Sequence, residues 1–264
     1  MNTTMMNQNN TINSDVEAKK LLNFSIKFSY SLLYNGAEVY RVEDSINRIC
    51  KSFKNIKAVN TFALSNMVMI SFVYNETNYT SMRRLNDTAK NLEKISMLNE
   101  LSRSIVSGKV NIDDGFKELK NIKNKSSYSN FTKISLVTLS APFLAFIFGG
   151  TIVDFIPACL AMFVEMLILV YIEKAGLPSF LTTFLSASGV ALFVMTMSKI
   201  VSIANISSIM IASIVPLFPG IQITNAMRDI LSGDILSGII GIMSAIFTAV
   251  SIAIGVVLVL RIFG

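Results

Sequence analysis

The chain has 264 residues, of which 52% are hydrophobic and only 15% are charged, and its mean hydropathy is +0.56. This balance excludes an ordinary soluble domain and indicates a membrane protein. The chain contains no histidine, which excludes Ser-His-Asp and Cys-His nucleophiles and histidine-ligated metals. The two cysteines, Cys50 and Cys159, form no C-x-x-C motif, so neither a disulfide framework nor a zinc site is expected. We expect no metal and no cofactor.

The net charge of +6 is distributed unevenly, because residues 1–133 hold 19 of the 23 Lys and Arg residues and 12 of the 17 Asp and Glu residues. Basic residues that flank apolar segments are typical of the cytoplasmic side of a membrane. The basic character therefore favours a lipid bilayer as the partner, and nucleic-acid binding is not expected.

The first half of the chain predicts a disordered tail over 1–14 and a cytosolic α+β domain over 15–130. Apolar residues recur at helical spacing from Asp15 until Asn35-Gly36, and a second amphipathic helix follows from Ala37. Runs of β-forming residues then predict a small antiparallel sheet, with strands over 56–64, 67–74 and 79–83. Helical spacing returns from Leu85 to Ile105, and Asp113 is expected to cap one more short helix.

The second half, residues 131–264, contains five long apolar segments. A helix that spans ~30 Å of hydrocarbon needs about 20 residues, whereas helices of soluble cores average about 11 to 12. The fold class is therefore an α-helical multi-pass membrane protein with five transmembrane helices and an N-terminal cytosolic α+β domain. Lys and Arg counting places the N-terminus in the cytosol and the C-terminus outside. The expected spans are 132–148, 153–172, 177–198, 200–219 and 235–260.

Glu165 lies within the second of these segments. An ionisable residue inside a membrane is costly, which makes it a candidate for a substrate or ion pathway. The alternative is a structural role, in which a protonated carboxyl bridges to a Ser or Thr of a neighbouring helix.

The stretch from Pro216 to Asp229 contains two prolines and a glycine within five residues, and such a stretch breaks a helix at about membrane depth. Breaks of this kind line cavities in transporters. Arg228 could then hold a carboxylate with both arms of its guanidinium, with Asn225 and Gln222 as neutral partners. The alternative is that the prolines merely end the fourth span and that Arg228 is a cytoplasmic anchor paired with Asp229.

A charged cluster over 36–44 places Glu38 and Arg41 three residues apart on one helix. Taken alone, a charged helix face is most often simply solvated. The chain contains neither G-x-x-x-x-G-K-[ST] nor G-x-G-x-x-G, so ATP-driven pumping by this chain is not expected.

Several runs together resemble the threonine/serine exporter (ThrE-like) family from about residue 15 to the end. They are Asn35-Gly-Ala-Glu-Val-Tyr-Arg-Val-Glu-Asp44, Asn91-Leu-Glu-Lys-Ile, Phe116-Lys-Glu-Leu and Pro219-Gly-Ile-Gln-Ile-Thr-Asn-Ala-Met-Arg-Asp-Ile-Leu-Ser-Gly-Asp234. The cytosolic motif comprises Gly36, Glu38, Tyr40, Arg41 and Glu43. The membrane motif comprises Pro219, Gly220, Gln222, Asn225, Arg228, Asp229 and Asp234.

This resemblance implies a cytosolic α+β domain followed by five spans, which agrees with the architecture expected above. Because the chain stops after its fifth span, it resembles the split, YjjP-type subunit, which works with a second, smaller (YjjB-type) membrane subunit. Single-chain members export threonine and serine, whereas split members export small dicarboxylates such as succinate.

The sequence therefore predicts a non-enzymatic subunit of a secondary exporter of small carboxylate-bearing metabolites in the plasma membrane, with homo-oligomers possible. A membrane-anchored ligand-sensing or regulatory protein is the alternative. An intramembrane hydrolase would need paired aspartates in facing spans or a zinc motif, and the sequence offers neither.

Overall fold

The structure, a computed structural model, describes residues 11–85, 89–126 and 128–263. The chain divides into two compact units, each of which is described by itself. The first unit contains the described residues up to 126 together with 224–242, and the second contains 128–223 together with 243–263. The sequence predicts a cytosolic domain over 15–130, whereas the first unit of the structure ends at residue 126 and also takes in 224–242.

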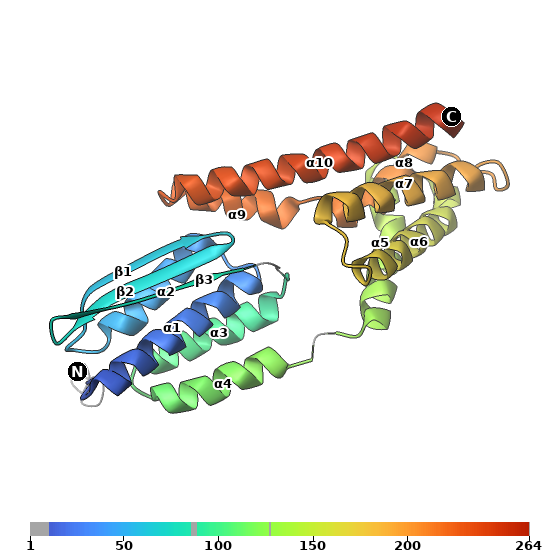
Figure 1. Ribbon diagram of the computed structural model, residues 1–264. Coiled ribbons are helices and arrows are strands. Elements are labelled where there is room, and N and C mark those ends of the chain that lie inside the picture. Colours follow the sequence, from blue (N-terminus) through green and yellow to red (C-terminus); the bar gives the residue numbers. More distant parts are fainter. Residues whose placement is uncertain (1–10, 86–88, 127, 264) are drawn as a thin grey trace, which may run out of the picture. The chain divides into compact units, whose positions relative to one another are not determined.

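The first unit is an α+β structure built on a three-stranded antiparallel sheet of order β1-β2-β3 (Figure 1). Helices α1 and α2 cover one face of the sheet, and helices α3 and α4 pack against α1. Large apolar side chains such as Phe24, Phe28 and Phe72 are fully buried between these layers. The elements are α1 (Asp15–Tyr34), α2 (Val39–Lys51), β1 (Lys57–Leu64), β2 (Met67–Tyr74), β3 (Thr77–Arg84), α3 (Leu92–Val106) and α4 (Ile112–Asn124).

The expected turns and strands are largely confirmed. Gly36 follows α1 with φ +88°, a left-handed conformation that favours glycine. The turn between β2 and β3 is shorter than expected, because Asn75 and Glu76 both take positive φ values, of 46° and 61°. Two such residues form a tight hairpin turn. The third strand therefore begins at Thr77 rather than at Tyr79.

Two expected helix starts are wrong. Helix α3 begins at Leu92, where Asn91 accepts a hydrogen bond from the backbone N–H of Lys94 at 2.9 Å. Leu85 instead continues from the sheet, with its N–H donating to the carbonyl of Asn66. Helix α4 is capped by Asn111 rather than by Asp113, because the Asn111 side chain accepts from the N–H of Asp114 at 2.8 Å.

Residues 1–10 of the expected tail lie outside the described residues, whereas residues 11–14 are described. Ile12 is buried, and its N–H donates to the Asn55 side chain at 3.0 Å. Ser14 caps α1 by accepting from the N–H of Glu17 at 3.2 Å.

The second unit consists of apolar helices (Figure 1). Helix α6 contacts α5, α7 and α8. Many of the buried residues in this unit are alanines, whose small side chains let the helix backbones approach closely. Helices α9 and α10 contribute to both units. The elements are α5 (Asn130–Ile147), the 3-10 turn η1 (Ile152–Asp154), α6 (Phe155–Glu173), α7 (Ser179–Met197), α8 (Ile206–Ile214), the 3-10 turn η2 (Val215–Leu217), α9 (Gly220–Leu231) and α10 (Ile235–Phe263).

Within the described part of the chain, four helices are long and apolar enough to cross a membrane: Asn130–Ile147, Ile152–Ile172, Ser179–Met197 and Ile235–Phe263. The expected fourth span over 200–219 is not one continuous helix. Helix α8 starts only at Ile206, and together with η2 it forms a pair with α9 that is bent by 55° at Phe218-Pro219. The prolines explain the bend, because proline lacks the N–H that would continue the helical hydrogen bonds. The number of spans rises to five if this bent pair is one span.

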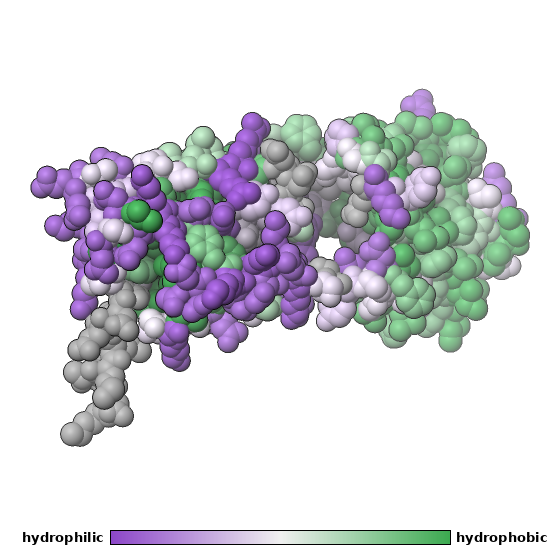
Figure 2. Space-filling model, turned by 60° about the horizontal axis from the view of Figure 1, so that its bottom comes forward, coloured by the Kyte–Doolittle hydropathy of each residue, from purple (hydrophilic) through white to green (hydrophobic). Residues whose placement is uncertain are grey.

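Figure 2 shows the contrast in surface chemistry, with hydrophilic side chains over the α+β unit and hydrophobic ones over the helical unit. Exposed large apolar side chains are frequent on every long helix of the second unit. A surface of this kind suits hydrocarbon rather than water.

Candidate functional site

The cytosolic motif forms the N-terminal end of helix α2. Glu38 occupies the N-cap position, yet its side chain makes no capping hydrogen bond to the helix. The first backbone N–H groups of a helix have no partner within the helix and need an acceptor from elsewhere. The amides of Val39 and Tyr40 are therefore available to another part of the chain.

The membrane motif forms α9 and its turn into α10. Gly233 takes φ +98° in this turn, and the N–H of Asp234 donates to the carbonyl of Asp229 at 2.9 Å. Gly238 lies close to α9, since a Cβ built on it would stand 2.7 Å from the carbonyl oxygen of Ala226. The tight turn and this close approach fix α9 against the start of α10.

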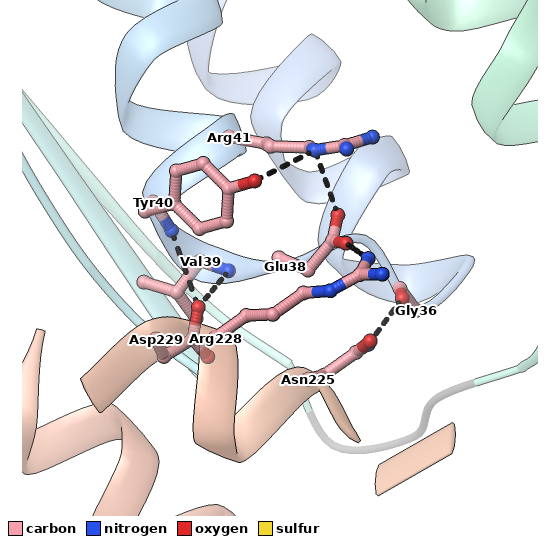
Figure 3. A network of polar contacts seen from close by, with 8 residues as sticks. All are labelled: Gly36, Glu38, Val39, Tyr40, Arg41, Asn225, Arg228 and Asp229. Atoms are coloured by element: carbon pink, nitrogen blue, oxygen red, sulfur yellow. Dashed lines mark hydrogen bonds and ion pairs between the residues drawn. The ribbon is translucent and has the colours of Figure 1, made fainter. Parts of the chain in front are cut away.

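The two motifs meet within the first unit (Figure 3). The Asp229 carboxylate accepts hydrogen bonds from the N–H of Val39 at 3.0 Å and of Tyr40 at 3.5 Å. The side-chain amide of Asn225 donates to the carbonyl of Gly36 at 3.0 Å. Asp229, only 4% exposed, thus supplies the cap that Glu38 does not provide.

Beside this cap, Glu38 lies between two arginines (Figure 3). Arg228 Nη1 donates to Glu38 Oε1 at 2.6 Å, and Arg41 Nε lies 3.1 Å from Glu38 Oε2. The single N–H of Arg41 Nε donates to the hydroxyl of Tyr40 at 3.1 Å, so the contact between Arg41 and Glu38 is an ion pair. This hydrogen bond, together with the charge of Glu38, raises the pKa of Arg41. The Glu38 side chain is 8% exposed, whereas those of Arg41 and Arg228 are 48% and 52% exposed.

Two further carboxylates, Glu43 and Asp234, lie beside the network. Glu43 Oε1 accepts from the N–H of Ala63 at 2.6 Å. Burial raises the pKa of Glu43, and the charges of Asp234 and Asp229 raise it further, although the hydrogen bond from Ala63 opposes them. Burial also raises the pKa of Asp234. Negative charge is therefore crowded where the motifs meet.

Glu165 lies in the second unit, apart from this network. It is fully buried and shares a stripe of α6 with Ala158, Ala161 and Met162, which are also fully buried. Neither of its carboxylate oxygens has a hydrogen-bond partner among the described residues. Thr138 Oγ1 on α5 and Ser186 Oγ on α7 are buried without a partner in the same way. The structural bridge to a Ser or Thr that the sequence left open is not formed in this structure.

The candidate residues thus separate into groups. Gly36, Glu38, Tyr40, Arg41, Asn225, Arg228 and Asp229 come together, with Glu43 and Asp234 beside them. Gln222 donates instead to the hydroxyl of Ser244 on α10 at 2.8 Å. Pro219 and Gly220 form the bend before α9. In the described part of the chain, no group of three or more Cys, Asp or Glu side chains is placed to hold a metal.

Sequence reasoning missed Asp154, which is fully buried at the start of α6. Its carboxylate accepts from the N–H and hydroxyl of Thr151 at 2.8 and 3.1 Å, and from the N–H groups of Ala204 and Asn205 at 2.8 and 3.2 Å. Asp154 therefore joins the segment before α6 to the segment before α8. The pattern Thr151-x-x-Asp154 ahead of an apolar run is a capping-box signal that could have identified it.

The fold and these sites define a multi-helix membrane protein that carries a polar α+β unit. The chain matches the family described as "Putative threonine/serine exporter" over residues 23–263, and it belongs to this family. It is 23% identical over 254 residues to the "Probable succinate transporter subunit YjjP" of Klebsiella aerogenes, a match that covers 94% of this chain and 96% of that protein. No solved structure matches the chain.

The family resemblance expected from the motifs is confirmed. The protein is a membrane exporter, and its family membership implies transport rather than an enzymatic reaction.

Proposed function

We propose that this protein is a subunit of a secondary exporter of small carboxylate-bearing metabolites across the plasma membrane. Threonine, serine and dicarboxylates such as succinate are the candidate substrates, and a second, smaller YjjB-type membrane subunit completes the transporter. The family match and the printed name of the Klebsiella aerogenes relative support this proposal. An ion gradient drives export, because the sequence carries no nucleotide-binding motif.

The observation that carries the proposal is the attachment of α9 to α2. Helix α9 directly follows the bend at Phe218-Pro219, and broken helices of this kind bind substrates in secondary transporters. Through Arg228, Asp229 and Asn225 it is bound to the α+β unit. A plain membrane anchor needs neither a broken helix nor a buried glutamate such as Glu165.

The test is the profile of extracellular metabolites from a strain that lacks this gene, with the gene for the small partner subunit deleted in parallel. Both deletions should lower the external concentration of the same carboxylate, and each should be restored only by its own gene. Unchanged external metabolites in both strains would favour the ligand-sensing alternative and overturn the exporter.

Arg228→Lys tests the role of the arginine in that assay. Lysine keeps the charge but lacks the planar fork, so export should fall by the equivalent of ~1.5 to 3 kcal/mol, the worth of one charged hydrogen bond. The comparison is made at matched membrane abundance. Wild-type export by this variant would leave Arg228 as a topological anchor.

The proposed topology has five spans, with the α8–α9 pair as the broken fourth, a cytosolic N-terminus and an external C-terminus. In a variant without the native cysteines, a membrane-impermeant thiol reagent should reach a cysteine placed after Arg261 and miss one at Asn10, which lies outside the described residues. Labelling at Asn10 in intact cells would refute this topology.

A further inference from the structure

We propose that Arg41 and Arg228 form a binding site for a carboxylate group from solution, and that Glu38 is a built-in competitor that occupies this site in the absence of ligand. This inference rests on the proposed function for the class of substrate. It adds the location of the carboxylate site, identifies Glu38 as the residue that occupies this site without ligand, and states that the ligand displaces Glu38 there.

The geometry shows how a carboxylate is held at this site. Each oxygen of Glu38 faces a different arginine, Oε1 towards Arg228 at 2.6 Å and Oε2 towards Arg41 at 3.1 Å. The two guanidinium groups come from different elements, α2 and α9, and they converge on one carboxylate (Figure 3). Charge-assisted pairs of this kind are the strong and geometrically specific way to bind a carboxylate.

The arginines have more donors than Glu38 uses. A guanidinium carries five N–H donors. The contacts to Glu38 use Nη1 of Arg228 and Nε of Arg41, so both Nη groups of Arg41 and Nη2 of Arg228 take no part in them. About half of each arginine side chain is exposed, at 48% and 52%. A small anion can therefore approach the pair from solvent while Glu38 is still bound.

Glu38 can leave the arginines without unfolding α2. It stands at the N-cap position, but the hydrogen bonds to the first amides of α2 come from Asp229. Rotation of the Glu38 side chain into solvent therefore leaves the helix cap intact. Glu38 brings one carboxylate to two guanidinium groups, so an incoming carboxylate meets N–H donors that Glu38 does not use.

The experiment measures binding of radiolabelled succinate, as a carboxylate probe, to the purified full-length protein in detergent. Glu38→Gln keeps the shape of the side chain and removes the competing charge, so the apparent Kd should fall about fivefold or more, as expected when a binding-competent state becomes more populated. Arg41→Lys and Arg228→Lys should each raise the Kd about tenfold or more, through loss of a charged hydrogen bond. Succinamide, which carries no charge, should not compete.

Arg48→Lys is the matched control, because Arg48 lies on the same helix and, among the described residues, forms its ion pair with exposed Asp44 at 2.9 Å. Its Kd should equal that of the wild type. If Glu38→Gln keeps the wild-type melting temperature and binds no tighter, Glu38 is not a competitor and the inference is wrong. If Glu38→Gln fails to fold, the two arginine variants decide, and wild-type binding by both would overturn the site.

These results are separate from those that test the proposed function. If the protein is an exporter that uses another site, deletion of the gene would abolish export. The Kd for succinate would then be the same in the wild type and in the Arg41→Lys and Arg228→Lys variants. A sensor would leave export unchanged, even if the two arginines bound the probe.

Discussion

The network of the α+β unit and Glu165 of the helical unit differ in whether their buried carboxylates have hydrogen-bond partners. In the α+β unit, Glu38 and Asp229 are nearly inaccessible, and each is held by charged or backbone donors at 2.6 to 3.5 Å. In the helical unit, Glu165 is fully buried and neither of its oxygens has a partner among the described residues. Buried polar groups that have hydrogen-bond partners hold a structure in place. A buried polar group without a partner costs free energy, so it is retained for a reason other than stability.

The same contrast exists within the helical unit. Asp154 and Glu165 both lie on one candidate span, Ile152–Ile172, and both are fully buried. Four donors surround Asp154, and none described reaches Glu165. A buried carboxylate is therefore informative about function only after its partners have been identified, and burial alone does not distinguish these two residues.

The largest effect should come from Asp154→Ala, which removes a fully buried carboxylate and takes the acceptor from the backbone N–H groups of Ala204 and Asn205. We expect a loss of about 2 to 3 kcal/mol in stability, the scale for hydrogen bonds to a charged group. The measurement is the yield and melting temperature of the purified protein. Asp114→Ala, at an exposed aspartate paired with Lys117, is the control and should melt like the wild type. If Asp154→Ala and Asp114→Ala had the same melting temperature, Asp154 would have no structural role.

Glu165→Gln should show the reverse behaviour, with normal abundance and melting but a loss of export of about tenfold or more, because glutamine keeps the shape and cannot ionise. Export is measured from about pH 6 to 8 at matched membrane levels. Met162→Leu, one turn away on the same buried stripe, should export normally. Export at the parental rate across this pH range would make Glu165 structural and remove the contrast between the two carboxylates.

Much of the fold could be predicted from the sequence, because its signals are local. The alternation of Val68, Ile70 and Phe72 predicts a half-buried strand, and Asn35-Gly36 predicts the end of the first helix. The start of α3 could not be placed in this way. Leu85 fits the helical spacing, but its N–H bonds to the sheet through Asn66, a contact between residues far apart in the chain.

The residues of the candidate site could be selected from the sequence, but the pairing of Arg228 with Glu38 could not. Sequence reasoning placed Arg41 near Glu38 on one helix, and it paired Arg228 with Asp229 only in the alternative of a cytoplasmic anchor. The structure pairs Arg228 with Glu38 across 190 positions, and Asp229 with the amides of α2. Spacing along one helix cannot reveal such contacts, because they depend on how α9 folds back onto the α+β unit.

Asp229→Ala tests a buried carboxylate that does have hydrogen-bond partners, and its expected loss of stability is smaller than that of Asp154→Ala. Loss of the cap on α2 should cost ~1 kcal/mol, within the usual range of about 0.5 to 2 for an N-cap. Asp229→Asn keeps an oxygen acceptor for the N–H of Val39 and should lose less. The two variants are compared by melting temperature in the same detergent. Equal losses would indicate that the charge of Asp229, rather than its hydrogen bond, holds the two motifs together.

The smallest effect concerns Glu43, whose half-buried carboxylate is affected by the charges of Asp229 and Asp234. Because its pKa is raised in the folded protein, the native state holds the proton more tightly than the unfolded state does. The wild type should therefore lose stability as the pH rises from about 4.3, the ordinary value for glutamate, through the raised native pKa. Glu43→Gln lacks this loss, and its amide oxygen can still accept from the N–H of Ala63.

The two proteins should accordingly melt together at about pH 4, and the variant should melt ~1 to 2 °C higher at about pH 7. Asp44→Asn, at an exposed carboxylate one residue away, should show no such pH-dependent gain over the wild type. A gain that is the same at both pH values would mean that glutamine merely packs better than glutamate. In that case the negative charges of Asp229 and Asp234 would not destabilise ionised Glu43. The carboxylate of Glu43 would then be as well accommodated as that of Glu38.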